Sequence, residues 1–455
     1  MPAKYHIHTQ PMPPKHKPIG KYGIVDWRED CSACHNCVKR ECAYDVYDKE
    51  RDRLVNALQY VDYLYECKGC LCCVQSCTKG LLTWETNPEY LKLGDEVWTP
   101  DIISSTWFQA ETGRIPVSGA GYPGPFCGPG FDSILTDMSE IVRPTRDGIH
   151  GREYINTQVD IGRKPTALAF NPEGKLALKS PPIVDIPIPA IFGLMPWHKT
   201  SPQLLTAILD AAKKLGTYAF VDDSSLFAHD VAIPYVSGEF VPLEARLAVW
   251  PDSPDVVRRI EKAKSTNPEM IAIVSLCLNQ NAVSRSLELA KAGIDVIHLL
   301  ADWHGMTVNS DKPKHITHAV REVHLAFVEQ GNRDEITLIA GGGIALAEHM
   351  AKTIICGADL VSVDVPLMVA LECRICKNCQ QGLPCPIEIE DVEHDYAVQR
   401  IVNLMGAWHN QLLEMMGAMG IREVRRLRGE VGRAMFFDDL ERECFEPIFG
   451  KRKEL

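Results

Sequence analysis

Cysteines in two runs near the N-terminus are the residues whose spacing most clearly predicts chemistry. Of the 17 cysteines in the chain, nine lie between Cys31 and Cys77. In each run three cysteines are separated by two residues, a spacing that lets three thiolates hold one face of a four-iron cubane. In two-cluster ferredoxins the fourth cysteine of each run binds the other cluster. We therefore predict two 4Fe–4S clusters with the ligand sets Cys31, Cys34, Cys37 and Cys77, and Cys67, Cys70, Cys73 and Cys42.

The same spacing has an alternative interpretation, a pair of structural zinc sites built from CxxC pairs. Two details depart from the bacterial ferredoxin pattern. Ala43 and Thr78 stand where a proline follows the fourth cysteine, and the first run is one residue longer. Cys72 is expected to be a small apolar neighbour of a cluster rather than a ligand.

A third group of cysteines lies far along the chain. Cys373, Cys376 and Cys379 repeat the two-residue spacing, and Cys385 follows, next to Pro386. This pattern predicts a third iron-sulfur cluster of the four-iron type, placed directly after the last predicted strand. A zinc knuckle is the alternative, although no histidine is interleaved with these cysteines.

From about Pro181 onward, apolar segments of strand length alternate with helical patterns. This alternation predicts a parallel sheet, and the number of units favours a (β/α)8 barrel over a short doubly wound sheet. Gly341, Gly342 and Gly343 lie between a predicted strand and a predicted helix, where backbone N–H groups can hold a phosphate. A tight strand-to-helix turn would use the same glycines. Clusters that carry single electrons, combined with a barrel, imply a flavin that converts them to two-electron chemistry.

The segment 85–135 is rich in glycine, proline and aromatic residues, which predicts irregular connecting structure built on turns rather than helix. It lies between the cysteine module and the barrel. We therefore expect five parts: an extended arm (1–24), an α+β ferredoxin-like domain with two clusters (25–84), a connecting segment entering the barrel (85–180), the barrel with the third cluster at its end (181–391), and a helical C-terminal tail (392–455).

Composition limits the classes of function. The chain has 455 residues, of which 45% are hydrophobic and 24% charged, and its net charge is −12. This net negative charge argues against non-specific electrostatic binding of nucleic acid or anionic lipid. No segment approaches the roughly 20 apolar residues of a membrane span, and the N-terminal segment lacks the apolar core of a signal peptide. We expect a cytoplasmic protein, in which clustered cysteines indicate metal rather than disulfides.

Several motifs carry a resemblance to a known family. They are GRIPVSGAG, PFCGPGFDSI, REYINTQVDIG, IPAIFGLM, LAKAGIDVI, the AGGGI turn, and GADLVSV followed by LMVALECRICKNC. From about Gly113 to the C-terminus the sequence resembles the FMN-binding domain of glutamate synthase large subunits, in the short archaeal-type form that carries a ferredoxin module and lacks the glutaminase domain.

The resemblance implies a flavin site and a cluster beside it. The family's barrel binds FMN, which implies a phosphate held near Gly342, Gly343 and Ser362. The flavin ring would lie against the end of the first strand, at Gly193, Leu194 and Met195. The family's cluster next to FMN maps onto Cys373, Cys379 and Cys385, and Cys376 would complete a four-iron site.

Three segments depart from the family pattern. VDDSS (221–225) replaces a glycine-rich substrate loop, Ser275 stands where the family has a lysine near the flavin, and ADWHGMTV (301–308) replaces a second glycine-rich loop. A flavin anion needs a cation nearby, and substrate carboxylates need donors. These departures predict little glutamate synthase activity for the isolated chain, and its catalytic residues remain unassigned.

Two hypotheses follow. In the first, the chain is an iron-sulfur flavoprotein oxidoreductase subunit that relays electrons between ferredoxin-type clusters, FMN and a third cluster. In the second, it is a non-catalytic electron-transfer or scaffold subunit of a larger redox complex, with a degenerate barrel. Both imply a hetero-oligomeric complex in which the partner is an NAD(P)H-dependent flavoprotein or another iron-sulfur subunit.

The cysteine spacing generates the first testable prediction. If all three sites fill, anaerobically prepared protein should contain about twelve iron atoms per chain. Metal analysis by mass spectrometry measures this directly. Zinc in place of iron would contradict the cluster assignment, and about eight irons would contradict the third cluster alone.

Overall fold

The computed structural model describes the chain except for residues 1–4, 18, 27–33, 35–36, 51–62, 116–129, 138–154, 166, 168–169, 178–180, 197–200, 239, 431 and 451–455. Cys31 and parts of three of the motifs above therefore lie outside the described residues.

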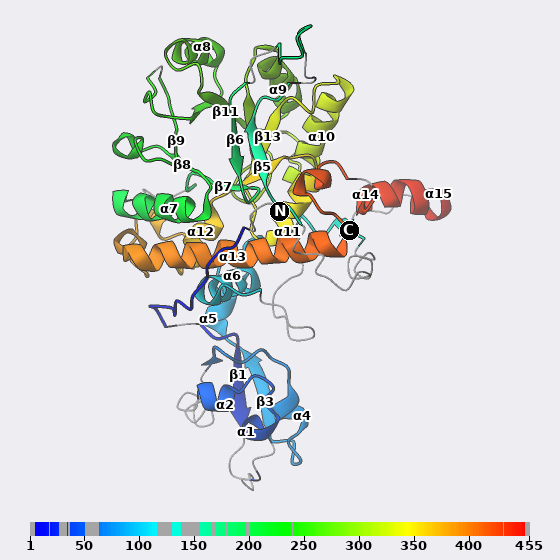
Figure 1. The fold of residues 1–455 in the computed structure, drawn as a ribbon. Helices are drawn as coiled ribbons and strands as arrows, with labels where there is room; N and C mark the ends of the chain where they lie inside the picture. The colour runs from blue at the N-terminus through cyan, green and yellow to red at the C-terminus, as the bar shows by residue number, and fades with distance from the viewer. Residues whose placement is uncertain are drawn as a thin grey trace.

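Eight parallel strands form the centre of the larger part of the molecule (Figure 1). Their order in the sheet is β10-β11-β12-β13-β14-β7-β8-β9. A further parallel bridge, between Tyr235 and Val249, joins the two edge strands and closes the ring. The predicted β/α barrel is therefore confirmed. The strands are β7 (Ala190–Phe192), β8 (Ala219–Val221), β9 (Ala232–Pro234), β10 (Leu247–Pro251), β11 (Ile271–Cys277), β12 (Val296–Leu300), β13 (Thr337–Gly341) and β14 (Leu360–Val363).

Helices follow most of these strands and cover the outside of the barrel. The first, α7 (Pro202–Leu215), shows why they form where they do. Ser201 caps its N-terminus by accepting a hydrogen bond from the Leu204 N–H, and Gly216 ends it in a left-handed conformation with φ 68°. The others are α8 (Val256–Thr266), α9 (Ala282–Lys291), α10 (Ile316–Glu329), α11 (Ala347–Ile355) and the short α12 (Val365–Ala370).

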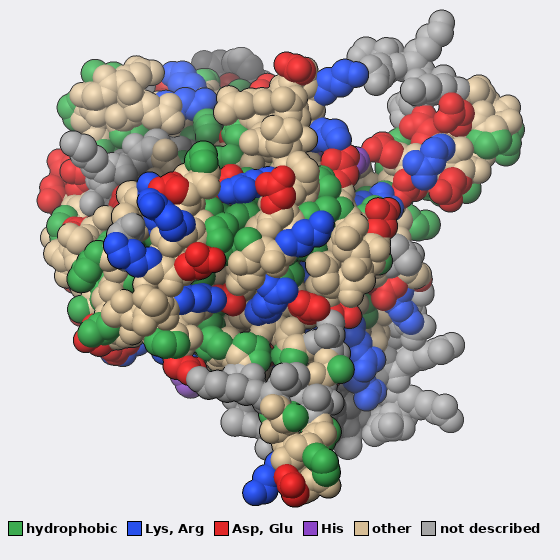
Figure 2. Space-filling model, turned by 90° about the horizontal axis from the view of Figure 1, so that it is seen from above, with side chains coloured by type: hydrophobic (Ala, Val, Ile, Leu, Met, Phe, Trp, Pro, Cys, Tyr) green, Lys and Arg blue, Asp and Glu red, His purple; other side chains and the backbone are tan. Residues whose placement is uncertain are grey.

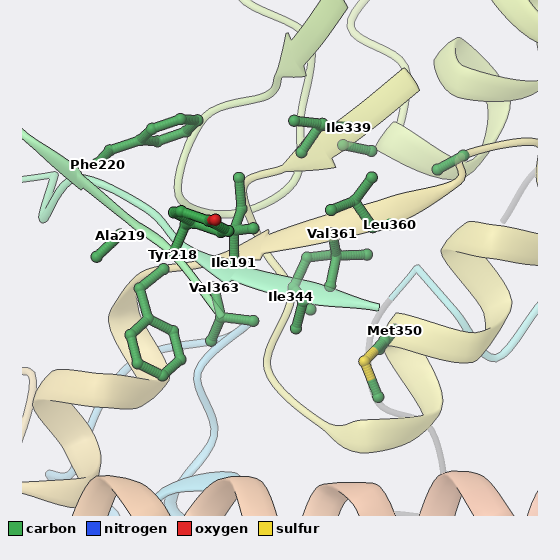
Figure 3. Packing of buried hydrophobic residues seen from close by; sticks show 14 of the residues in the cluster. Ile191, Tyr218, Ala219, Phe220, Ile339, Ile344, Met350, Leu360, Val361 and Val363 are labelled. Atoms are coloured by element: carbon green, nitrogen blue, oxygen red, sulfur yellow. The ribbon is translucent and has the colours of Figure 1, made fainter. Parts of the chain in front are cut away.

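The barrel strands are buried on both faces, which explains their nearly continuous apolar sequences. Figure 3 shows one part of this core, where residues of β7, β13 and β14 pack together and reach α11 through Ile344 and Met350.

The ferredoxin-like module lies at the opposite end of the molecule from α8 and α9 (Figure 1). Its antiparallel sheet has the order β2-β1-β3. Four residues, Val38, Val46, Leu64 and Leu82, form a small core separate from that of the barrel. The elements are β1 (Tyr22–Asp26), α1 (Val38–Glu41), α2 (Val46–Lys49), β2 (Tyr63–Leu64), α4 (Cys72–Gln75) and β3 (Leu82–Thr86).

The prediction that residues 85–135 lack helix is wrong. This segment contains α5 (Pro88–Leu91) and the 13-residue α6 (Pro100–Thr112). Thr99 caps α6, Pro100 occupies its first position, and Gly113 ends it with φ 66°. In this part of the segment a proline and a glycine thus begin and end a helix, whereas its richest stretch, 116–129, lies outside the described residues.

The C-terminal region packs across the barrel as the long helix α13 (His394–Ala418), in contact with α7, α6 and α11. The N-terminal arm crosses it, because the Asn403 amide donates to Gln10 O at 2.8 Å and Arg400 donates to Met12 O at 2.9 Å. Antiparallel pairs join β5 (Val159–Gly162) to β6 (Ile183–Ile186) and β4 (Ile134–Thr136) to β15 (Ala434–Phe436). Between α13 and β15 lies the 3-10 helix η8 (Val424–Leu427). After β15 come α14 (Phe437–Leu440), a π-helical turn (Glu441–Phe445) and α15 (Glu446–Phe449).

Charged side chains of both signs are interspersed on the face shown in Figure 2. Among the described helices, none combines the length and the apolar character that crossing a bilayer requires.

A polar chain occupies the barrel interior near the carboxyl ends of the strands. His298 Nδ1 lies 3.1 Å from Ser275 Oγ, and its Nε2 lies 2.9 Å from Ser362 Oγ. Burial lowers the pKa of His298 to about 3, so the imidazole is neutral at physiological pH. A Cβ on Gly341 would lie 1.9 Å from Ser362 Oγ. The strand between His298 and Ser362 must therefore end in glycine.

This packing generates a stability prediction. Gly341→Ala should lower the free energy of unfolding by about 1–3 kcal/mol, because the added methyl group displaces Ser362 from His298. Gly238→Ala is the matched control, since a Cβ there meets nothing within 4 Å. Urea denaturation of both variants measures the difference. Equal stability of the two would contradict the proposed packing.

Candidate functional site

The second predicted ligand set surrounds one pocket. Cys42, Cys67, Cys70 and Cys73 all line an open pocket with about 470 Å³ of empty space. The fourth cysteine of the first run thus lies beside the three cysteines of the second run, as the crossed pairing requires. Cys72 does not line this pocket.

The backbone around this pocket suits a cluster. Gly69 and Leu71, between the cysteines, have φ angles of 67° and 62°. Turns of this kind direct successive N–H groups into a concavity that accepts an anion. Burial raises the pKa of Cys73 to about 12, so its thiolate form needs a positive charge beside it, such as bound iron.

The first ligand set is described only in part, because Cys31 lies outside the described residues. Cys37 and Cys77 pack against the same small core of the module. The Cys77 thiol accepts a hydrogen bond from the Leu81 N–H at 3.3 Å. This and neighbouring N–H groups hold the pKa of Cys77 below its ordinary value, which favours a thiolate. The assignment of this set stays a prediction.

The third cysteine group also surrounds one pocket. Cys373, Cys376, Cys379 and Cys385 line an open pocket with about 360 Å³ of empty space. Three non-glycine residues in or beside this loop have positive φ angles, namely Glu372 at 73°, Ile375 at 50° and Lys377 at 62°. Such conformations cost on the order of 1 kcal/mol each and concentrate at functional sites.

Contacts tie the third pocket to the barrel mouth. Asp95 Oδ2 lies 3.2 Å from Lys377 Nζ and 3.0 Å from His304 Nε2. Lys377 also lies 5.1 Å from the Trp303 ring. The 301–308 loop is therefore held against the third cysteine loop. Nothing in the sequence pattern around Asp95 indicated this role.

Within the described ranges, no three His, Cys, Asp or Glu side chains converge closely enough to hold a single metal ion. The cysteines line open pockets. The iron-sulfur clusters themselves remain predictions.

The six predicted FMN-binding residues gather at three neighbouring strands. Ser362 pairs with Gly341 on one side and with Ile191 on the other, so β13, β14 and β7 lie in that order. A Cβ on Gly193 would lie 3.7 Å from the Ser362 Cβ. Leu194 and Met195 follow and pack, half-buried, against the core.

The glycine turn offers donors to a phosphate. Among the described residues, the buried N–H groups of Gly343 and Ile344 have no hydrogen-bond acceptor. A Cβ on Gly342 would lie 2.5 Å from Asp302 O, and one on Gly343 would lie 2.6 Å from Gly305 Cα. The glycines therefore also allow the 301–305 loop to pack closely.

Two observations oppose a phosphate here. The Ser362 hydroxyl is already bonded to His298. The Asp364 carboxylate accepts a hydrogen bond from the Val365 N–H, and its burial raises its pKa to about 6. The role of Ser362 toward a phosphate stays a prediction.

Comparison with known proteins supports the resemblance seen in the sequence. A conserved region in glutamate synthase matches residues 250–422. The archaeal-type glutamate synthase (NADPH) of Dehalococcoides mccartyi is 25% identical and is aligned over 89% of this chain and 93% of its own length. The archaeal glutamate synthase (NADPH) of Archaeoglobus fulgidus is also 25% identical, over 89% of this chain and 92% of its own length.

Among solved structures, flavocytochrome b2 with pyruvate bound has a TM-score of 0.43 at 9% identity and covers 71% of this chain and 83% of its own. Mandelate oxidase with an FMN adduct has a TM-score of 0.40 at 15% identity and covers 74% of this chain and 91% of its own.

The crossed ligand pairing generates a prediction for a matched pair of variants. Cys42→Ser should remove about four iron atoms per chain or convert that cluster, because the Cys42 thiol is its fourth ligand. Cys72→Ser should leave the iron content unchanged, since Cys72 does not line the pocket. Iron analysis and electron paramagnetic resonance of the reduced proteins check this. Equal iron content in the two variants would show that the crossed pairing is wrong.

Proposed function

With the similarity to archaeal-type glutamate synthases as its premise, we propose that this chain is an iron-sulfur oxidoreductase subunit of glutamate synthase type. It relays electrons between two ferredoxin-type clusters, a third cluster and FMN in the barrel. The observation that carries this proposal is the third cysteine pocket, which the Asp95 contacts fasten to the barrel mouth.

The exposure of the cysteines indicates which of the three sites a partner protein can approach. Cys34 and Cys70 of the ferredoxin-like module are exposed, so a partner can approach both of its sites. In the third loop Cys376 is exposed whereas Cys373 is buried. That site therefore has one side toward solvent and one toward the protein core.

FMN fits the end of the barrel at the glycine turn. The unpaired N–H groups of Gly343 and Ile344 would hold its phosphate, and Gly193 leaves room beside β14. When bound, FMN would exchange single electrons with the clusters and electron pairs with a substrate. The chain's own contribution is to fix the third cysteine loop against this end of the barrel.

We further propose a hetero-oligomeric complex. The relatives are named as NADPH enzymes, which supports an NAD(P)H-dependent flavoprotein as the electron donor. The chain's own composition and cysteine usage support a cytoplasmic location.

A second candidate function is a non-catalytic electron-transfer or scaffold subunit. The specific observation that favours it is the polar chain of Ser275, His298 and Ser362 inside the barrel, together with the buried carboxylate of Asp364. These groups occupy the region where a flavin and its substrate would need donors and a cation.

Flavin content separates the two functions. Anaerobically purified protein is extracted with acid, and the released flavin is quantified by fluorescence against the iron content. About one FMN per chain, reduced when the clusters are reduced by dithionite, supports the relay. Full iron content without flavin, even after incubation with excess FMN, would overturn it in favour of the scaffold subunit.

The buried carboxylate generates a prediction with two measurements. Asp364→Asn should bind FMN at least about tenfold more tightly, because a carboxylate within ~4 Å of a phosphate costs on the order of 4 kcal/mol at an effective dielectric near 20. Asp222→Asn is the control, since Asp222 is exposed just after β8. Fluorescence titration with FMN measures the affinity.

The same variant changes how stability depends on pH. Because burial raises the pKa of Asp364 from 3.8 to about 6, ionising it destabilises the folded state. This cost is absent below the unfolded pKa, grows as the pH rises from about 4 to 6, and is complete above. Asp364→Asn should thus be more stable than the natural protein by about 1–3 kcal/mol at pH 7. A stability difference that does not shrink toward pH 4 would contradict the assignment.

A further inference from the structure

A cavity lies where the ferredoxin-like module, the N-terminal arm, α6 and α13 meet. It is an open pocket, and its empty space of about 280 Å³ includes adjoining solvent. The residues that matter for its chemistry come from segments far apart in the sequence: Lys17, Tyr65, Trp107, Glu372, Arg374 and Arg400.

The lining contains the cationic side chains of Lys17, Arg374 and Arg400. In the part of the chain that the structure describes, neither Lys17 nor Arg374 forms an ion pair. Arg400 is fully buried and donates hydrogen bonds only to the backbone oxygens of Ala370, Met12 and Trp107. Arg400 also interacts electrostatically with the carboxylates of Glu111 and Glu372. The cations that remain for a negatively charged ligand are therefore Lys17 and Arg374.

The carboxylate in the lining, Glu372, is already satisfied. It accepts hydrogen bonds from the Lys15 N–H at 2.7 Å, from the His16 N–H at 2.9 Å, and from the Tyr396 hydroxyl. Its Oε2 also lies 3.0 Å from His16 Nδ1. Burial would raise the pKa of Glu372, but these donors and the nearby Arg400 hold it below its ordinary value. Glu372 therefore has its own partners, and in the described part of the chain it forms no ion pair with Lys17 or Arg374.

An independent observation concerns Trp107. This side chain is only 7% exposed, it lines the cavity, and its Nε1–H has no hydrogen-bond acceptor. A buried donor without an acceptor costs about 1–3 kcal/mol. An oxygen atom of a bound ligand would satisfy it.

We propose that this cavity is a binding site for a small oxyanion, either a carboxylate or a phosphate. Lys17 and Arg374 supply the positive charge, and the Trp107 Nε1–H donates a hydrogen bond to the ligand. Tyr65 stands two residues before Cys67, and Arg374 directly follows Cys373. The ligand therefore lies between the second and the third cysteine pockets. The site does not depend on FMN or on the reaction proposed above.

The test uses the full chain, prepared anaerobically with its metal, in a buffer free of phosphate and carboxylates. Isothermal titration calorimetry with inorganic phosphate and, separately, with acetate measures binding. Stronger binding of phosphate would identify a phosphate-bearing ligand, and stronger binding of acetate an organic acid. Both results support the site.

Two variants locate the site. Arg374→Gln removes a cation and should weaken binding about tenfold, and Trp107→Phe removes only the N–H donor and should weaken it about fivefold. Lys291→Gln is the control, because it removes an exposed cation at the end of α9 that does not line this cavity. Unchanged iron content and circular dichroism show that each variant folds.

Binding that weakens in Arg374→Gln and Trp107→Phe but not in Lys291→Gln confirms the site. The absence of heat with either anion, or equal affinity in all three variants and the natural protein, would overturn it.

Discussion

The carboxylate of Asp95 is the interaction on which the arrangement of the candidate sites depends. Its Oδ1 accepts hydrogen bonds from the Val97 and Trp98 N–H groups, and its Oδ2 faces His304 and Lys377. Burial would raise the pKa of Asp95, but these donors hold it below its ordinary value. One ionised carboxylate therefore joins the connecting segment, a loop at the barrel mouth and the third cysteine loop.

The cysteine loops share a local geometry that explains why they can surround open pockets. Of the seven described non-glycine residues with positive φ, four lie in or beside these loops: Leu71, Glu372, Ile375 and Lys377. Left-handed residues between cysteines turn backbone N–H groups toward a common centre, where a cluster's sulfur atoms need donors. The conformational strain of these residues persists because packed elements fix the loops on either side. These elements are the small core of the module and the short helix α12.

Polar side chains inside the barrel are linked by hydrogen bonds. His298 links Ser275 to Ser362 across the ring, and its burial keeps it neutral. The barrel interior therefore holds uncharged hydrogen-bonding groups at this position. Asp364 adds a buried negative charge at the same end. The charges at this end of the barrel, rather than its shape, bear on whether it can bind a flavin. Flavin binding in turn distinguishes the two proposed functions.

The sequence by itself determined what depends on short-range spacing and periodicity. The alternation of apolar segments predicted the barrel, since this pattern is a local consequence of chain geometry. The grouping of Cys42 with Cys67, Cys70 and Cys73 came from the ferredoxin pattern, and although the four line one pocket, their role as a ligand set stays a prediction. Reasoning from composition failed at α6, where Pro100 takes the first helical position and Gly113 ends the helix. Only the tertiary structure decided that Asp95 meets His304 and Lys377, that His298 reaches Ser362, and that Lys17, Trp107 and Arg374 line one cavity. These contacts join segments far apart in the chain, and no period or spacing in a sequence specifies which distant polar side chains will meet once the apolar faces are buried.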